Sequence, residues 1–150
     1  MSEAIFHHVG RTVSDMEAAL RFYRDIVGLR VVDDAVLEGE EMSEFIAVDG
    51  VRIRAVMLSQ DDRHPFLELF EFHEPPPPSG VAPRPNDLGS THPCFLTDDI
   101  DATHERLVKA GVRVTRPPLA IEEGPFAGQS ILYAYDPDGA VVEFWSTPPT

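Results

Sequence analysis

The sequence predicts an α+β fold in which two βαβββ modules form a curved mixed sheet around a cavity. Two observations carry this prediction: the two halves of the chain repeat one order of strand and helix patterns, and a proline-rich segment separates them. A chain of 150 residues has room for one domain built from both halves. We therefore expect a single domain over 1–150, with one module at 5–74, a Pro-rich linker at 75–87 and a second module at 88–147.

The repeat appears when His8 is set against His92, an offset of 84 residues (92 minus 8). The segments HVGRTVSDMEAALRFYRDIVGLRV and HPCFLTDDIDATHERLVKAGVRV then show the same order of short strand, helix cap, helix, glycine and strand. With one residue dropped, Gly28-Leu-Arg-Val also falls on Gly111-Val-Arg-Val. This agreement predicts two modules of the same topology.

Each module is expected to contain one helix that begins at a capping residue. Ser14 with Glu17 forms a capping-box pattern, and Asp98 with Asp101 forms a weaker one. Apolar residues follow at helical spacing, and each helix is expected to end at the glycine of the repeat.

Strand patterns follow each helix, separated by turn signals at Asp49-Gly50 and Asp136-Pro-Asp-Gly139. A single βαβββ module would leave one face of its sheet bare, so we expect the two modules to pack within a chain or by exchange between chains. The expected strands are roughly 29–37, 51–59 and 66–73 in the first half, and 112–115, 129–135 and 140–146 in the second.

Composition excludes several classes of function. There are 26 Asp and Glu against 12 Lys and Arg, giving a net charge of -14 that disfavours nucleic acid and anionic membranes as partners. The one Cys excludes an intramolecular disulfide and a Cys-rich zinc site. No apolar run approaches the roughly 20 residues of a membrane span. We expect a cytoplasmic protein that acts on a small molecule.

Strand alternation gathers polar side chains on one face of each predicted sheet. Leu67 and Glu68 are expected to point to opposite faces of the sheet. His8 and His92 lie in the first strands of the two modules, and Glu68 and Glu143 lie at matching positions in the last strands. Each residue alone could be a solvated carboxylate or a structural histidine. Four residues placed symmetrically by a repeat favour a shared function, and two imidazoles with two carboxylates suit a divalent metal ion.

The segments HVGRTVSDMEAALRFYRDIVGL, FLEL, HPCFLTDDIDATHERLVKAGV and DPDGAVVEF resemble the vicinal oxygen chelate superfamily, over nearly all of residues 5–146. That superfamily includes glyoxalase I, methylmalonyl-CoA epimerase, extradiol dioxygenases and bleomycin-resistance proteins. The resemblance implies a metal-binding cavity whose four ligands match His8, Glu68, His92 and Glu143. It implies one divalent ion per site (Zn, Ni, Co, Mn or Fe), with Glu143 or Glu68 as the catalytic base.

The implied activity is that of an isomerase, epimerase or lyase that removes a proton next to a metal-bound carbonyl or vicinal oxygen. Two alternatives remain open at this point. An iron(II) extradiol dioxygenase would use His8, His92 and Glu143 without Glu68, and a drug-binding protein of the same fold would have no turnover.

Position in the predicted strands gives further candidate residues. Arg52 and Arg54 could hold a substrate carboxylate or phosphate, or could pair with surface acids. His7 should point away from His8 in an extended strand and is expected to be structural. We also expect a homodimer, because 150 residues carry a large sheet surface. The aromatic candidates for the substrate pocket, which could equally be core residues, are Phe70, Tyr133 and Trp145.

Overall fold

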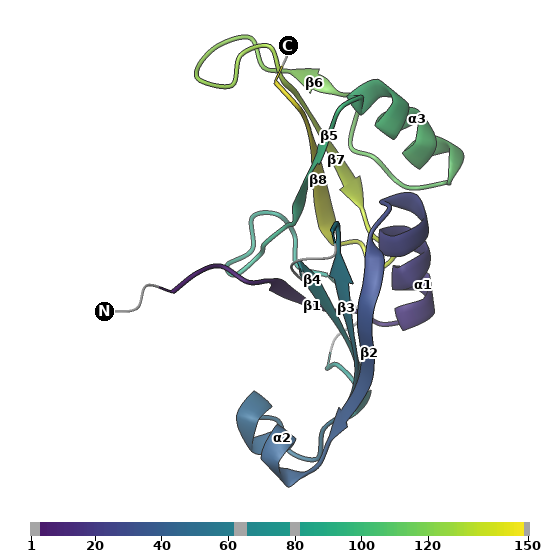
Figure 1. Ribbon diagram of the computed structural model, residues 1–150, viewed down its shortest axis with the longest axis vertical. Coiled ribbons are helices and arrows are strands. Elements are labelled where there is room, and N and C mark those ends of the chain that lie inside the picture. The colour runs from purple at the N-terminus through teal and green to yellow at the C-terminus, as the bar shows by residue number, and fades with distance from the viewer. Residues whose placement is uncertain (1–3, 62–65, 79–81, 149–150) are drawn as a thin grey trace. The chain divides into compact units, whose positions relative to one another are not determined.

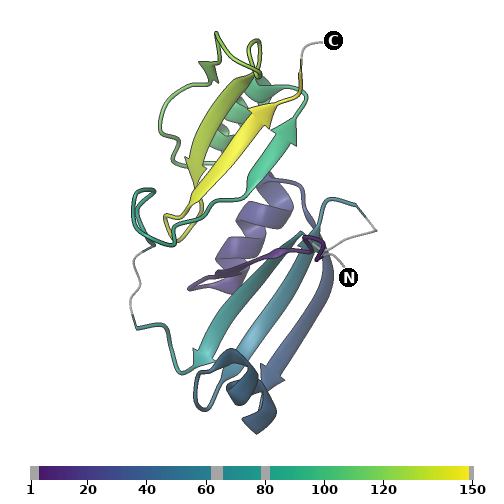
Figure 2. The ribbon, with the colours of Figure 1, turned by 90° about the vertical axis from the view of Figure 1, so that its left-hand side faces the viewer.

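A computed structural model describes residues 4–61, 66–78 and 82–148. The chain forms two compact units, unit 1 (Met1–Gly80) and unit 2 (Val81–Thr150), and the boundary falls within the segment expected to be a linker. Each unit contains a four-stranded mixed sheet with a helix on one face (Figures 1 and 2). This architecture confirms the predicted α+β fold of two βαβββ-like modules.

Unit 1 has the strand order β1-β4-β3-β2. Strand β1 runs parallel to β4, whereas β4, β3 and β2 are antiparallel neighbours. Its helix α1 continues directly into a π-helical segment, η1, and a second helix, α2, lies between β2 and β3 in the chain (Figure 1). The elements are β1 (Val9–Thr12), α1 (Met16–Leu20), η1 (Arg21–Ile26), β2 (Arg30–Glu38), α2 (Glu40–Ile46), β3 (Arg52–Ser59) and β4 (Leu67–Glu74).

Unit 2 repeats this topology, with the strand order β5-β8-β7-β6 and with β5 parallel to β8. In both units, therefore, the first strand pairs with the last strand of the same module. The elements are β5 (Cys94–Thr97), α3 (Ile100–Lys109), β6 (Leu119–Ala120), β7 (Ser130–Tyr135) and β8 (Val141–Ser146).

The core of each unit lies between its helix and one face of its sheet. In unit 1 the face that carries Leu67, Leu69 and Glu71 is turned to α1, because a Glu71 carboxylate oxygen accepts a hydrogen bond from the Met16 backbone N–H at 3.1 Å. In unit 2 the corresponding face carries Val142 and Phe144. The other face of each sheet carries the predicted site residues Glu68 and Glu143. Buried residues on the helix side include Tyr23, Val56, Leu58, Phe95, Leu107, Leu132 and Ala134.

The predicted helix caps were wrong by one residue in both modules. Asp15, with extended backbone angles, accepts a hydrogen bond from the Ala18 N–H at 2.9 Å and caps α1, so Ser14 is not the cap. Asp99 accepts from the Ala102 N–H at 2.8 Å and caps α3 in place of Asp98. These two aspartates are equivalent in the repeat, and their carboxylates also favour the positive end of the helix dipole.

Helix α2 was not predicted from the sequence. Its seven residues, EEMSEFI, have no buried member and no clear apolar face, so periodicity could not find them. The structure holds the helix through Ser43, whose hydroxyl donates to the Gly39 carbonyl at 2.9 Å and accepts from the Val51 N–H at 3.2 Å. The Asp49-Gly50 turn therefore follows a helix instead of directly joining two strands.

The strand expected at 112–115 is reduced to a single bridge between Val114 and Ala134. Regular pairing on this edge resumes only at β6, which has two residues. Pro117 and Pro118 lie between the two stretches and have no N–H to donate, which explains the interruption. Among the helices of the described residues, none is long and apolar enough to cross a membrane.

The capping assignment makes a stability prediction. Asp99→Ala should lower the free energy of unfolding by about 1 kcal/mol, because it removes the acceptor for the Ala102 N–H and a favourable charge at the start of α3. Urea denaturation followed by circular dichroism measures this loss. Asp98→Ala is the matched control and should change stability by only a few tenths of a kcal/mol. Equal losses in the two variants would contradict the assignment.

Candidate functional site

The first part of the candidate site is the His8–Glu68 pair of unit 1. His8 precedes β1, and Glu68 is the second residue of β4. His8 Nε2 lies 3.0 Å from Glu68 Oε2. The other ring nitrogen of His8, Nδ1, lies 2.7 Å from His7 Nδ1, which fixes the orientation of the imidazole. His7 was expected to point away, but residues 7 and 8 lie outside the regular strand, so the two side chains meet.

The second part is the His92–Glu143 pair of unit 2. His92 precedes β5, and Glu143 lies in the middle of β8. His92 Nε2 lies 3.2 Å from Glu143 Oε2. The side chain of Glu143 is only 10% exposed, so its charge needs a partner, and the imidazole supplies one. The structure thus brings each predicted histidine together with the predicted glutamate of its own unit.

The same register produces both pairs. Gly10 stands opposite Glu68 in the parallel β1–β4 pairing, and Cys94 stands opposite Glu143 in the parallel β5–β8 pairing. Each histidine lies two residues before that opposing residue, just ahead of the strand, and its imidazole reaches the glutamate. Two residues distant in the sequence are in this way held within hydrogen-bond distance in each unit.

Two hydrogen-bond donors flank the His92–Glu143 pair. Tyr133 stands opposite Glu143 in the β7–β8 pairing, and its hydroxyl lies 3.4 Å from His92 Nε2. Partial burial, followed by the charge of Glu143, raises the pKa of the Cys94 thiol to about 12. The same two causes raise the pKa of the Tyr133 hydroxyl. Both groups therefore keep their protons at neutral pH beside an acidic side chain.

Unit 1 has different residues at the corresponding places. Gly10 and Met57 stand opposite Glu68 on the two neighbouring strands, and neither side chain donates a hydrogen bond. The cross-strand neighbours of Glu68 are therefore apolar or without a side chain, and Phe70 lies two residues along β4 on the same face, whereas His8 also contacts His7. The two pairs are alike in geometry and unlike in chemistry.

The sheet face that carries Glu143 also carries Trp145, two residues further along β8. The ring of Phe126 meets Trp145 edge-on with centroids 5.3 Å apart. The indole Nε1 is buried and has no hydrogen-bond partner among the described residues. The structure thus places Tyr133 and Trp145 on the predicted face, as it does Phe70 in unit 1.

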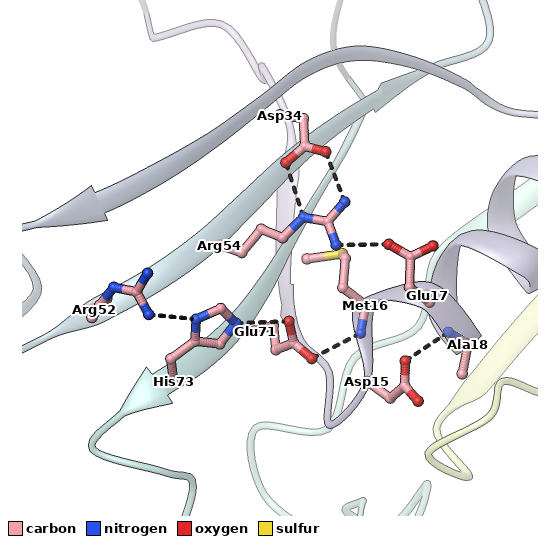
Figure 3. Close-up of polar contacts among 9 residues, drawn as sticks. All are labelled: Asp15, Met16, Glu17, Ala18, Asp34, Arg52, Arg54, Glu71 and His73. Carbon is pink, nitrogen blue, oxygen red and sulfur yellow. Dashed lines mark hydrogen bonds and ion pairs between the residues drawn. The ribbon is translucent and has the colours of Figure 1, made fainter.

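Arg52 and Arg54 lie on the opposite face of the unit 1 sheet from Glu68. The β3–β4 register puts Met57 on the Glu68 face, so Arg54, three residues earlier, faces the helix side. The guanidinium of Arg54 donates two hydrogen bonds to Asp34, at 3.0 and 2.8 Å, and one to Glu17 at 2.8 Å. Figure 3 shows Arg54 between these two carboxylates.

A second chain of contacts runs from Arg52 to the start of α1 (Figure 3). Arg52 contacts Glu38 at 3.1 Å and His73 at 3.3 Å, and His73 Nε2 lies 2.9 Å from Glu71, which accepts from the Met16 N–H. The structure does not bring either arginine to the His8–Glu68 pair. Both instead tie strands of the sheet to each other and to the helix.

Comparisons with known proteins show the family to which this chain belongs. Residues 5–144 match the model of the Glyoxalase/Bleomycin resistance protein/Dioxygenase superfamily. The chain belongs to this superfamily. A 2-epi-5-epi-valiolone epimerase from Actinomyces sp. is 32% identical over 147 residues, which are 95% of this chain and 79% of that protein. A lactoylglutathione lyase from Haemophilus influenzae is 29% identical over 91% of this chain and 88% of its own length.

A solved structure shows the same fold. The glyoxalase family protein APC24694 from Bacillus cereus has a TM-score of 0.83 and 22% sequence identity, and the match covers 99% of this chain and 97% of that chain. The superfamily membership and the fold predicted from the sequence motifs are therefore confirmed.

The donor atoms of this superfamily member fit a divalent metal ion. Zinc binds imidazole nitrogen and carboxylate oxygen at about 2.0–2.2 Å, so neighbouring ligands lie about 2.9 Å apart at 90° and about 3.4 Å apart at a tetrahedral angle. The N···O distances of 3.0 and 3.2 Å in the two pairs lie within this range. Within the described parts of the chain, no group of three or more His, Cys, Asp or Glu is close enough to hold a metal. Each pair therefore offers two donor atoms to such an ion.

A wide hollow of about 960 Å³ lies elsewhere in unit 1, between α2 and the ends of β2, β3 and β4. Glu74 lines it, six residues along β4 from Glu68, which corresponds to roughly 20 Å along the strand. Its titratable lining is acidic apart from Arg52, which is paired with Glu38. Its lining includes neither His–Glu pair, and we assign the hollow no catalytic part.

The Arg54 network predicts a pH-dependent stability. The hydrogen bonds from Arg54 lower the pKa of the Asp34 carboxyl below its ordinary value. The ion pair therefore stabilises the fold above about pH 4, the range of an unfolded Asp, and this stabilisation is lost as the pH falls through the lowered pKa. Asp34→Asn should cost less than about 1 kcal/mol at pH 7, since the pair is partly exposed, and less still at pH 3.

Urea unfolding at several pH values measures this dependence. Asp33→Asn is the control. The Asp33 carboxylate, next to Asp34 in the sequence, has no such arginine partner among the described residues, so this variant should show little change in stability at either pH. A cost of Asp34→Asn that is the same at pH 3 and pH 7 would contradict the assignment.

Proposed function

We propose that the protein is a metal-dependent isomerase, epimerase or lyase that moves a proton on a carbon next to a carbonyl or vicinal oxygen of a small molecule. One observation carries the proposal. In both units an imidazole nitrogen lies beside a carboxylate oxygen, at 3.0 Å in unit 1 and at 3.2 Å in unit 2. The names of the Actinomyces relative, an epimerase, and the Haemophilus relative, a lyase, support the same class of reaction.

In this proposal His8, Glu68, His92 and Glu143 are the four protein ligands of one divalent ion. One pair comes from a unit 1 and the other from a unit 2, of the same chain or of two chains. The homodimer expected from the sequence belongs to this proposal, as does a cytoplasmic location. Zinc, nickel, cobalt, manganese and iron all accept this set of nitrogen and oxygen donors.

When bound, the ion supplies Lewis-acid polarisation that acidifies the C–H bond beside the substrate carbonyl. A carboxylate oxygen of Glu143 or Glu68 accepts the proton from carbon, while the electron pair of the broken C–H bond moves toward the carbonyl oxygen. The same carboxyl group, or the other one, returns a proton to the neighbouring carbon or to the opposite face. Return to another carbon is isomerisation, and return to the opposite face is epimerisation.

The surroundings of the two glutamates make them unequal candidates for the base. Glu143 lies beside two groups that keep their protons, the Cys94 thiol and the Tyr133 hydroxyl. Among the described residues, His8 is the hydrogen-bonding partner of Glu68, whose neighbours across the strands are Gly10 and Met57. We keep both glutamates as candidates, and the exchange experiment below separates them.

Metal binding by the protein tests this proposal. The protein should bind one divalent ion for each two His–Glu pairs. Glu68→Gln and Glu143→Gln should each weaken cobalt(II) binding at least tenfold, because loss of even an outer-shell partner costs about 10–100-fold in affinity. Elemental analysis and calorimetric titration measure this. His104→Ala, which removes an imidazole from α3, is the control and should bind cobalt as the unmodified protein does. Unchanged affinity in both glutamine variants would contradict the ligand assignment.

Hydrogen exchange at carbon tests the proposed reaction. Metal-loaded protein in D₂O should exchange the carbon-bound hydrogen next to the carbonyl of a suitable member of a panel of 2-hydroxy ketones, such as dihydroxyacetone. Proton NMR follows the exchange. Replacement of the base by Gln should slow it by about 10²–10⁴-fold, the usual contribution of general base catalysis.

Glu71→Gln, on the opposite face of β4, is the control for this experiment and should keep full exchange. Full exchange in both Glu68→Gln and Glu143→Gln would contradict the proposed bases. Oxygen uptake with a catechol, unaffected by Glu68→Gln, would instead support a dioxygenase. A metal-free protein that binds small molecules without turnover would support the drug-binding class.

A further inference from the structure

A positively charged residue lies on the functional face of unit 2, at the outer edge of its sheet. The Tyr135 N–H donates to the Arg113 carbonyl at 2.9 Å, and the Thr115 N–H donates to the Tyr133 carbonyl at 3.0 Å. These bonds flank the Val114 bridge to β7 and set Arg113 directly opposite Tyr135. Tyr135 shares its face with Tyr133, and Tyr133 shares its face with Glu143. Arg113 therefore lies on the same face as the His92–Glu143 pair.

The guanidinium of Arg113 is held by an aromatic ring. Its Cζ lies 3.5 Å from the centroid of the Tyr135 ring, a cation–π contact. The side chain has no hydrogen bond or ion pair with any residue that the structure describes. By contrast, Arg54 is held by two carboxylates and Arg84 by one. The ring covers one side of the guanidinium plane and leaves its N–H donors, which lie in that plane, without partners.

This arrangement is the one expected for anion recognition. A guanidinium binds carboxylate or phosphate through two parallel hydrogen bonds, and a ring that fixes its plane lowers the entropy lost on binding. The chain carries a net charge of -14, which repels anions in general. An anionic substrate would therefore need a positive side chain of this kind at the site itself.

We propose that Arg113, held by Tyr135, is an anion-binding residue that takes the phosphate or carboxylate group of the substrate. That the anion belongs to the substrate rests on the function proposed above, whereas anion binding at Arg113 does not. Arg113 is two strands across and two residues along from Glu143, about 12 Å between Cα atoms at ordinary strand spacing. An anion held at Arg113 would therefore lie several bonds from the carbon that loses its proton at Glu143, so the geometry points to a phosphorylated or carboxylated compound whose anionic group is separated from the reacting carbon by a short chain.

A signal for this residue was present in the sequence. The repeated segments Gly28-Leu-Arg-Val and Gly111-Val-Arg-Val each contain an arginine, whereas strand position favoured Arg52 and Arg54 as the candidates. Those two are held by acids on the helix side of their sheet. Arg113 is on the functional face because the edge segment that contains it pairs with β7.

The test is a titration of the full-length protein with glycerol 2-phosphate, with acetate and with neutral glycerol, followed by NMR of the arginine Nε–Hε and tyrosine ring signals. Signals of Arg113 and Tyr135 should move along a saturating curve with glycerol 2-phosphate, acetate or both, and should not move with glycerol. Arg113→Ala should abolish saturation at Tyr135. Arg113→Lys should weaken it, because an ammonium lacks the planar pair of donors.

Lys109→Ala is the matched control, since it removes one positive charge at the end of α3 and should leave the titration unchanged. Linear shifts without saturation, or the same curve in Arg113→Ala, would overturn the proposal. The titration is run as purified and again after treatment with a chelator. Saturation in both conditions with no metal bound in either would overturn the metal site alone, and metal binding without saturation would overturn the anion site alone.

Discussion

The parallel pairing of the first strand with the last strand is the constraint on which the candidate site depends. In a βαβββ module the chain must pass through a helix and two further strands before the last strand can lie beside the first. This return sets Gly10 opposite Glu68 and Cys94 opposite Glu143, so that a histidine two residues earlier reaches each carboxylate. A slip of one residue would turn every side chain to the other face and separate both pairs.

The two faces of each sheet carry different kinds of residue. The helix side is closed by apolar residues and, in unit 1, by the arginine network that joins β2, β3 and β4 to the start of α1. The other face is left for the His–Glu pairs and their neighbours. Because unit 2 has a thiol and a phenol, Cys94 and Tyr133, where unit 1 has Gly10 and Met57, duplication of the fold has not duplicated the chemistry.

The sequence predicted the repeat, the fold class, the family and the alternation that places Glu68 and Glu143, because strand periodicity and turn residues report local geometry directly. It did not predict α2, whose seven residues bury nothing, nor the use of Asp15 and Asp99 as caps, since Ser14 and Asp98 match the same pattern one residue earlier. The contact of His7 with His8 and the stacking of Arg113 on Tyr135 depend on irregular backbone and on pairing across an edge. Neither follows from the order of residues alone.

The central claim is that the two His–Glu pairs bind one metal ion together. Proton NMR of the cobalt(II)-substituted protein tests it directly, because the ring N–H of each cobalt-bound imidazole gives a strongly shifted, exchangeable signal. The account predicts two such signals, one lost in His8→Ala and the other in His92→Ala, with cobalt still detectable in each variant at higher concentration. A single imidazole signal, or two signals that are both unaffected by His8→Ala, would contradict it.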